Sequence, residues 1–262
     1  MKPLFPLSLA MIAIVACTDS TSPTQNLSSS DQKNSGGGTF TVSGSLTNDM
    51  FTFDDGTFGT SAGSTFTVES TTGGFGASAP PITGLFNNAS NKFIGRLDNH
   101  KVNLIVPNGG SAYDISYDLY IIGSWDGNGK QSGKQYGVDI WQNDIACSPT
   151  GPAVATLIRT TFSNQKTVQQ SFPHNYGEGG GTNKAGEGAF AADAFGYAND
   201  PTSNTPQFQS FGDTWYKMHF TGVNPCGAGN PIYLQFSVPG ATLQSNYDES
   251  WGIDNVRIMT DA

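Results

Sequence analysis

Three carboxylates, Asp248, Glu249 and Asp254, stand close together in the stretch YDESWGIDNVRI (247–258). Carboxylates grouped in this way can form a general acid–base pair, hold a metal ion, or make the polar side of a strand. Asp248 and Glu249 are adjacent, so a strand would point them to opposite faces. We therefore expect these two to be the solvated start of a strand, and Asp254 to be the carboxylate with a function.

The large apolar residues of the same stretch are Trp251, Ile253, Val256 and Ile258. The first two and the last two are out of phase by one residue. A slip of one residue moves every following side chain to the other face of a sheet. All four can be buried only if an extra residue bulges at Asp254-Asn255. Such a bulge would turn Asp254 toward a neighbouring strand.

The sequence contains no complete set of residues typical of a catalytic site. Glycoside hydrolysis needs two carboxyl groups about 5–9 Å apart, and no glutamate of the chain stands in the E-x-D-x-x-E spacing of jelly-roll glucanases. Gly59–Gly63 matches G-x-S-x-G, but no helix follows it, as that motif requires. WDGNGK (125–130) places Asp126 and Asn128 as in a calcium loop, but it lacks the remaining ligands, so we expect a hairpin turn.

Two tryptophans are candidates for contact with a ligand. Trp141 and Asp139 alternate out of phase with the apolar run that ends at Ile140, which predicts that both point outward. An outward Trp beside an Asp fits a sugar or protein contact; the alternative is that Trp141 covers the second face of a sandwich edge. Trp215, which shares the polar face of its strand with Lys217, is the second candidate.

Short apolar runs of period two, split by Gly, Pro, Asn and Asp, fill the chain from residue 39 onward. Such runs are typical of half-buried antiparallel strands. We expect about eleven strands, near residues 39–42, 50–53, 64–69, 92–97, 101–106, 113–122, 135–142, 153–162, 214–220, 231–238 and 250–259. The predicted fold over 39–262 is all-β: a two-sheet antiparallel β-sandwich of jelly-roll or concanavalin-like type with little helix.

The N-terminal residues indicate export. Lys2 precedes an apolar stretch, residues 4–16, that is too short to span a membrane as a helix and has the form of a signal peptide over 1–16. Ile14-Val15-Ala16-Cys17 resembles the lipobox of bacterial lipoproteins, which implies that Cys17 becomes the lipidated N-terminus; the alternative is an ordinary signal peptide that holds a Cys. Residues 17–38 are rich in Ser, Thr and Gly and are expected to be a flexible tether.

The charge of the chain excludes some partners. The formal net charge is −9, and removal of residues 1–16 takes away one more cation. Binding to nucleic acid rests on Lys and Arg that neutralise phosphates, so no nucleic acid is expected, and anionic lipid would not attract the domain either. We expect anchoring in the bacterial cell envelope, at the periplasmic face or the outer membrane, to come from the lipid on Cys17.

Two further cysteines remain, Cys147 and Cys226. In an exported chain a disulfide between them is the default expectation. A metal-bound or nucleophilic thiol is the alternative, but neither cysteine has a CxxC partner.

Three motifs carry a resemblance. WGIDNVRI (251–258) resembles the terminal strand of MAM domains and of many bacterial carbohydrate-binding jelly rolls, and FTFDDGTFG (51–59) is similar to their opening motif. YDLYIIGSWDGN (117–128) resembles exported bacterial jelly-roll proteins without an assigned activity. The resemblance implies that the first and last strands run side by side.

It also implies a structural Ca²⁺ held by Asp54 or Asp55 and by Asp254. Asp54 stands where those modules often have Glu, which has a longer reach. The alternative is that Asp54 and Asp55 form a turn and that Asp254 accepts backbone hydrogen bonds.

These observations predict a lipid-anchored, non-catalytic envelope protein that docks a partner protein or membrane complex through a jelly-roll domain. A glycan-binding module is the alternative, and a glycoside hydrolase-like enzyme is a weaker one.

Overall fold

The computed structural model describes residues 47–55, 65–70, 82–131, 134–135, 137–178, 182–197, 211–240, 242–244 and 248–261. The predicted signal peptide, the tether with Cys17 and the strand expected at 39–42 lie outside these residues. The described residues form strands, turns and loops, and none of them belongs to a helix that could cross a membrane.

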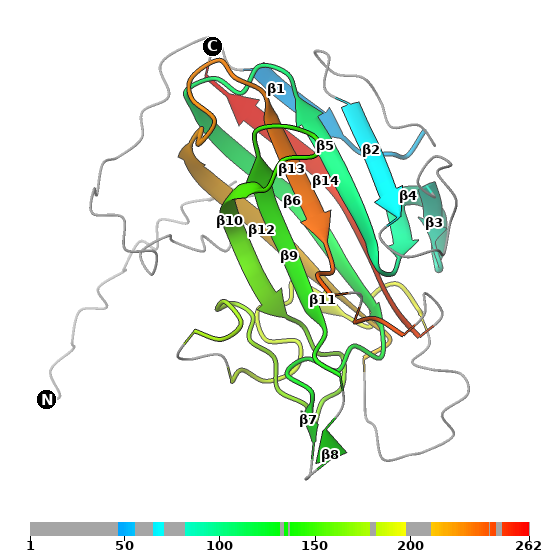
Figure 1. Cartoon of the computed structure of the whole chain (residues 1–262). Coiled ribbons are helices and arrows are strands. Elements are labelled where there is room, and N and C mark those ends of the chain that lie inside the picture. Colours follow the sequence, from blue (N-terminus) through cyan, green and yellow to red (C-terminus); the bar gives the residue numbers. More distant parts are fainter. Residues whose placement is uncertain are drawn as a thin grey trace, which may run out of the picture.

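The strands form two antiparallel sheets that pack face to face (Figure 1). The seven-stranded sheet has the order β11-β12-β6-β14-β4-β3, and β1 pairs with β14 outside this path. Its strands are β1 (Thr47–Phe51), β3 (Ile82–Leu85), β4 (Asn88–Leu97), β6 (Ala112–Gly123), β11 (Ala191–Ala192), β12 (Asp213–Val223) and β14 (Glu249–Thr260). The predicted two-sheet β-sandwich is confirmed.

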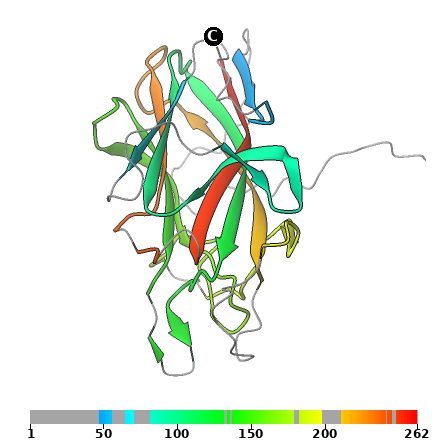
Figure 2. The ribbon, with the colours of Figure 1, turned by 90° about the vertical axis from the view of Figure 1, so that its right-hand side faces the viewer.

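The five-stranded sheet has the order β10-β9-β13-β5-β2. Its strands are β2 (Thr65–Ser70), β5 (His100–Val106), β9 (Ile140–Ala146), β10 (Ala153–Thr161) and β13 (Ile232–Ser237). A hairpin of β7 (Lys130–Gln131) and β8 (Lys134–Gln135) projects beyond one end of the sandwich, as two perpendicular views show (Figure 1, Figure 2).

The core lies between the two sheets and follows from the period-two pattern of the strands. On β6 the side chains of Tyr117, Leu119 and Ile121 face the other sheet, and each is at most 2% exposed. Large aromatic rings fill the space between the layers, and Trp141 and Trp251 contact edge to face with ring centroids 6.2 Å apart. Burial of each such side chain contributes roughly 1.5–3 kcal/mol, and more for the largest rings.

Most predicted strands occur close to their predicted positions, but β9 begins at Ile140 instead of near 135. The short strands β3, β7, β8 and β11 were not predicted. A strand of two to four residues has too few positions to show an alternating pattern, so neighbouring strands and not the local sequence define it.

β14, the last strand in chain order, lies inside the seven-stranded sheet. It pairs with β6 along most of its length, with β4 on its other side near Trp251 and Ile253, and with β1 near Val256. The first strand of the described residues and the last strand therefore run side by side, as the resemblance implied.

Candidate functional site

The outer face of the seven-stranded sheet, which points away from the five-stranded sheet, carries polar and aromatic side chains instead of a bare solvated surface. On β6 the alternation that buries Tyr117 and Leu119 between the sheets places Asp118 and Tyr120 on this outer face. A second, smaller apolar cluster lies here; it contains Leu85, Phe93, Tyr120, Ile122 and Phe195. The outer face is thus a structured surface with a core of its own.

β14 bulges at the predicted place. Asp254 pairs with Asp118 and Arg257 pairs with Ser116, so that two residues of β14 face one residue of β6. Asn255 adopts the left-handed conformation, with φ = 48°, which Asn tolerates better than most residues. The bulge returns Val256 to the core, where it is fully buried. The predicted bulge is confirmed, and it leaves Asp254 on the outer face.

Asp254 is buried there among hydrogen-bond donors. The hydroxyl of Tyr120 donates to its Oδ2 at 3.0 Å, and the backbone N–H of Asn255 donates to its Oδ1 at 2.7 Å. The side-chain amide of Asn255 also donates to Asp118 Oδ2 at 2.7 Å. Burial raises the pKa of Asp254 to about 7, and the nearby carboxylates of Asp118 and Asp54 add to the rise.

The opening motif reaches the same place. Phe51 of β1 pairs with Val256 of β14, and Asp54 follows shortly after, so its negative charge raises the pKa of both Asp254 and Tyr120. Asp54 Oδ1 accepts a hydrogen bond from the backbone N–H of Lys92 at 3.0 Å. Asp55 is exposed.

The predicted calcium ligands are therefore brought together in part. The structure places Asp54, Asp118 and Asp254 in one neighbourhood, which we name the β14 acidic group. Each of these carboxylates already accepts a hydrogen bond from a protein donor. For Asp254 this is the alternative to a calcium site, in which its carboxylate accepts a backbone hydrogen bond. Carboxylate oxygens are the type of ligand that a hard cation such as Ca²⁺ prefers. Calcium binding at Asp54, Asp55 and Asp254 stays a prediction.

Trp215 lies beside this group on β12, and it is half-buried. Phe190, 45% exposed, packs against it edge to face with centroids 4.5 Å apart. The ammonium of Lys217 lies 4.6 Å from the centre of the Phe190 ring and 5.0 Å from that of Trp215. These are cation–π distances. Trp215, one of the predicted contact residues, is thus part of a larger aromatic surface.

A second exposed ring extends this surface at the turn between β3 and β4. Phe86 is 74% exposed and lies against Tyr197 with centroids 5.9 Å apart. The guanidinium of Arg96 lies 5.4 Å from the centre of the Tyr197 ring. We name Phe86, Phe190, Tyr197 and Trp215 the aromatic patch. Sequence patterns did not indicate Phe86 or Phe190, because a single exposed ring in a turn has no periodic signal.

The expectation that Trp141 and Asp139 point outward is wrong. Trp141 is fully buried between the sheets, and Asp139 is 1% exposed. The strand begins at Ile140, so an alternation counted from residue 136 does not carry into it. Trp141 instead shares the inner face of β9 with Ile145, and no ligand from solution can stack on its ring.

Asp139 lies next to two acids whose role the sequence did not reveal, Asp126 and Glu249. The expectation that Glu249 is a solvated residue is wrong, because its exposure is 0%. A signal was present: Glu249 stands two residues before Trp251, and on a strand that spacing puts both on the core side. Asp248, at the rim, is half-buried as its expected role allows.

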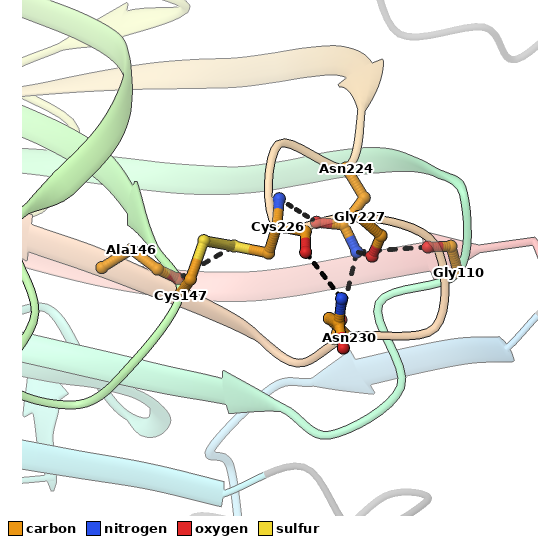
Figure 3. Close-up of a disulfide and its surroundings, with 7 residues drawn as sticks. All are labelled: Gly110, Ala146, Cys147, Asn224, Cys226, Gly227 and Asn230. Carbon is orange, nitrogen blue, oxygen red and sulfur yellow. Dashed lines mark hydrogen bonds between the residues drawn. A yellow bond between two sulfur atoms is a disulfide. The ribbon is translucent and has the colours of Figure 1, made fainter.

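The predicted disulfide is present between Cys147 and Cys226, with Cα atoms 5.4 Å apart (Figure 3). Cys147 follows β9 directly, and Cys226 lies in the turn that leads from β12 in one sheet to β13 in the other. The side-chain amide of Asn224 holds this turn by donating to the carbonyls of Gly110, Gly227 and Asn230 at 3.0–3.1 Å. The bridge links the end of β9 to the turn at which the chain crosses between the sheets.

The fold and these sites define a two-sheet antiparallel β-sandwich domain with an exposed aromatic patch, a fully buried group of acids, and the β14 acidic group, in which Asp118 and Asp254 are buried and Asp54 is exposed. The sequence matches no model of a known protein family and no curated protein. Among solved structures, the K1 cleaved adhesin domain of Lys-gingipain from Porphyromonas gingivalis W83 is similar at 9% identity, over 84% of this chain and 100% of that one, with a TM-score of 0.39.

A family 35 carbohydrate-binding module from Clostridium thermocellum is also similar, at 9% identity over 82% of this chain and 98% of that one, with a TM-score of 0.30. Likenesses this distant define neither a family nor a function for the chain.

Proposed function

We propose that this protein is a lipid-anchored, non-catalytic binding protein of the bacterial cell envelope, and that it docks another envelope protein through the aromatic patch. The observation that carries the proposal is the exposure of Phe86 and Phe190, at 74% and 45%, on one structured face. Buried centres of protein interfaces are enriched in aromatic residues and Arg. Lys217 and Arg96 border the rings, so the expected partner surface is apolar with acidic side chains.

A protein partner is favoured over a sugar because neighbouring side chains partly cover the aromatic rings. Sugar rings stack on open aromatic faces, but Lys217 and Phe190 already cover parts of Trp215. Trp141, the other candidate for stacking, is buried. A glycan-binding role remains the alternative, and it depends on Trp215 alone.

A non-catalytic role is favoured by the burial of the acids. Asp126, Asp139 and Glu249 have raised pKa values, of about 7, 7 and 9, as catalytic acids often have. Their exposures are 3%, 1% and 0%, whereas a glycosidase must bring its two carboxyl groups to both sides of a polysaccharide bond.

The anchor in the proposal is the acyl chain on Cys17, with residues 17–38 as the tether. Labelling of cells with a radioactive fatty acid tests it: the wild-type chain should carry label and sediment with membranes, and Cys17→Ala should do neither. Equal labelling of both chains, or none of the wild type, would contradict the anchor.

The docking surface is tested by photo-crosslinking in intact cells that make the protein. A photoreactive amino acid is placed at Phe190, at Phe86, or at Val154 of β10, which is 51% exposed on the other sheet and serves as the matched control. Positions 190 and 86 should crosslink to the same protein, and position 154 should not.

Phe190→Ala should then weaken binding of the captured protein by about 30-fold or more, the loss of a hot-spot aromatic. Identical adducts from all three positions, or no adduct, would refute protein docking at this patch. Retention of the chain on envelope polysaccharide, lost on Trp215→Ala, would establish the glycan-binding alternative instead.

A further inference from the structure

A second group of acids lies at the end of the sandwich from which the β7–β8 hairpin projects. Asp126 follows β6, Asp139 precedes β9, and Glu249 is the first residue of β14. One carboxylate oxygen of each lies within 4.8 Å of the others. We name these three residues the buried trio. Both sheets contribute to it, because β6 and β14 belong to one sheet and β9 to the other.

The buried trio differs from the β14 acidic group in position and setting. Asp254 lies on the outer face of β14, whereas Glu249 points to the core side with Trp251. Burial and the neighbouring carboxylates raise all three pKa values of the trio. The negative charges of these carboxylates therefore repel one another.

Protein donors satisfy only part of the trio. Asp139 Oδ2 accepts a hydrogen bond from the backbone N–H of Asp126, and Glu249 Oε2 accepts one from the backbone N–H of Gln244 at 2.9 Å. The other oxygen of Glu249, Oε1, is buried and accepts no hydrogen bond among the described residues. A buried carboxylate oxygen without a partner is costly, so this atom needs an explanation.

Gln165 supplies an independent observation. Its side chain is 8% exposed, and its amide nitrogen reaches Asp126 Oδ1 and the carbonyl of Ser124, the latter at 2.9 Å. Its amide oxygen is buried and has no hydrogen-bond partner among the described residues. A rotation of the side chain exchanges the amide nitrogen and oxygen. It gives up the hydrogen bond to the Ser124 carbonyl, so Gln165 offers a fourth oxygen beside Asp126 only when a bound cation replaces that bond.

We propose that Asp126, Asp139 and Glu249 bind a hard divalent cation of the calcium class, with the amide oxygen of Gln165 as a further ligand. All four side chains offer oxygen, which Ca²⁺ takes in sets of six to eight, and the trio contains no nitrogen or sulfur ligand of the kind that Zn²⁺ prefers. The cation neutralises the buried charge and joins the start of β14 to the segments before β9 and after β6. It thereby ties the two sheets together at this end.

The first test measures binding to the full protein after treatment with chelator. Tb³⁺, a luminescent substitute for Ca²⁺, is added, with excitation of tryptophan; Trp125 directly precedes Asp126 in the sequence and is fully buried. Sensitised emission should appear and fall again when Ca²⁺ is added. At a calcium concentration 100 times Kd, the melting temperature should rise by about 5–10 °C.

Variants assign the ion to the trio. Glu249→Gln and Asp139→Asn should each weaken Ca²⁺ binding at least 100-fold and abolish the rise in melting temperature. Asp144→Asn is the matched control, a 7% exposed Asp on β9 that is hydrogen-bonded to Thr156 and Gln142. Asp254→Asn removes a carboxylate of the β14 acidic group instead, and this variant should still bind the ion at the trio and show sensitised emission.

The proposal is overturned if chelator-treated wild type binds neither Tb³⁺ nor Ca²⁺. It is also overturned if Glu249→Gln and Asp139→Asn keep the binding and the melting shift of wild type, or if Asp254→Asn alone removes them. If the two trio variants do not fold, the Asp254→Asn protein decides: one bound ion with sensitised emission supports the trio, and none refutes it.

Discussion

Removal of the disulfide should lower the stability of the domain by an amount that the chain topology predicts. Cys147 and Cys226 are 79 residues apart. In the chain-entropy description, a cross-link that closes a loop of this length removes about 4.5 kcal/mol of entropy from the unfolded ensemble. We expect the double variant Cys147→Ala/Cys226→Ala to lose up to this amount of unfolding free energy, which corresponds to about 9–18 °C in melting temperature.

The native structure of that variant should change little. Cys226 lies in a turn that Asn224 holds through three carbonyls, and the backbone N–H of Cys226 donates to Asn224 Oδ1 at 2.9 Å. β9 and β13 also pair next to the bridge, from Tyr233 opposite Ala146 to Ser237 opposite Gln142. The effect should therefore fall on the unfolded chain, and the denaturant m-value should rise because that chain becomes less compact.

The assay is urea denaturation of both proteins, followed by far-UV circular dichroism and by tryptophan fluorescence. Wild type with a reductant is the control and should match the variant. A loss below about 1 kcal/mol with an unchanged m-value would refute the reasoning. A changed native fluorescence would show that the bridge shapes the folded state, which the contacts of Asn224 argue against.

Three further outcomes are expected. Trp141→Ala should lower the free energy of unfolding by about 3–5 kcal/mol in chemical denaturation, because it removes a fully buried ring. Val154→Ala, at an exposed position, should change it by less than about 0.5 kcal/mol. Equal effects would contradict the core position of Trp141. Asn255→Val should lower the free energy of unfolding by about 2 kcal/mol, since a β-branched residue is strained at φ = 48° and the hydrogen bond to Asp118 is lost. Asn255→Gly should lower it less, because glycine adopts this φ without strain. The reverse order would argue against the bulge. The folded-state pKa of Asp254, about 7, is above its ordinary 3.8, so the native state binds the extra proton between these values and stability falls as pH rises through that window. In chelator, the protein should therefore melt at a higher temperature at pH 5 than at pH 8, and Asp254→Asn should reduce this difference.

Sequence patterns predicted the parts of the fold that depend on neighbours along the chain. The alternation on β6 and β13 identified half-buried strands. The phase break between Ile253 and Val256 located the bulge and predicted that Asp254 turns toward a neighbouring strand, where Tyr120 of β6 donates to it. Each of these rests on a period of two that the sequence displays directly. The pairing of Cys147 with Cys226 followed because no other candidate thiol remained.

The contacts that sequence patterns did not predict join segments far apart in the chain. The buried trio forms where a residue after β6, a residue before β9 and the first residue of β14 meet. No local period encodes such a meeting. Trp141 was misplaced because its parity was counted through residues that precede the strand. Parity is meaningful only once the first paired residue is known, and pairing depends on the partner strand.

The place of β14 has a consequence for how the chain reaches its native state. Its residues fill the gap between β6 and β4 and pair with β1 some two hundred positions earlier. Until the polypeptide has emerged as far as Thr260, this layer exposes two unpaired edges, which are templates for aggregation. Contacts so distant in sequence also form slowly. Truncation before Glu249 should therefore yield an insoluble product.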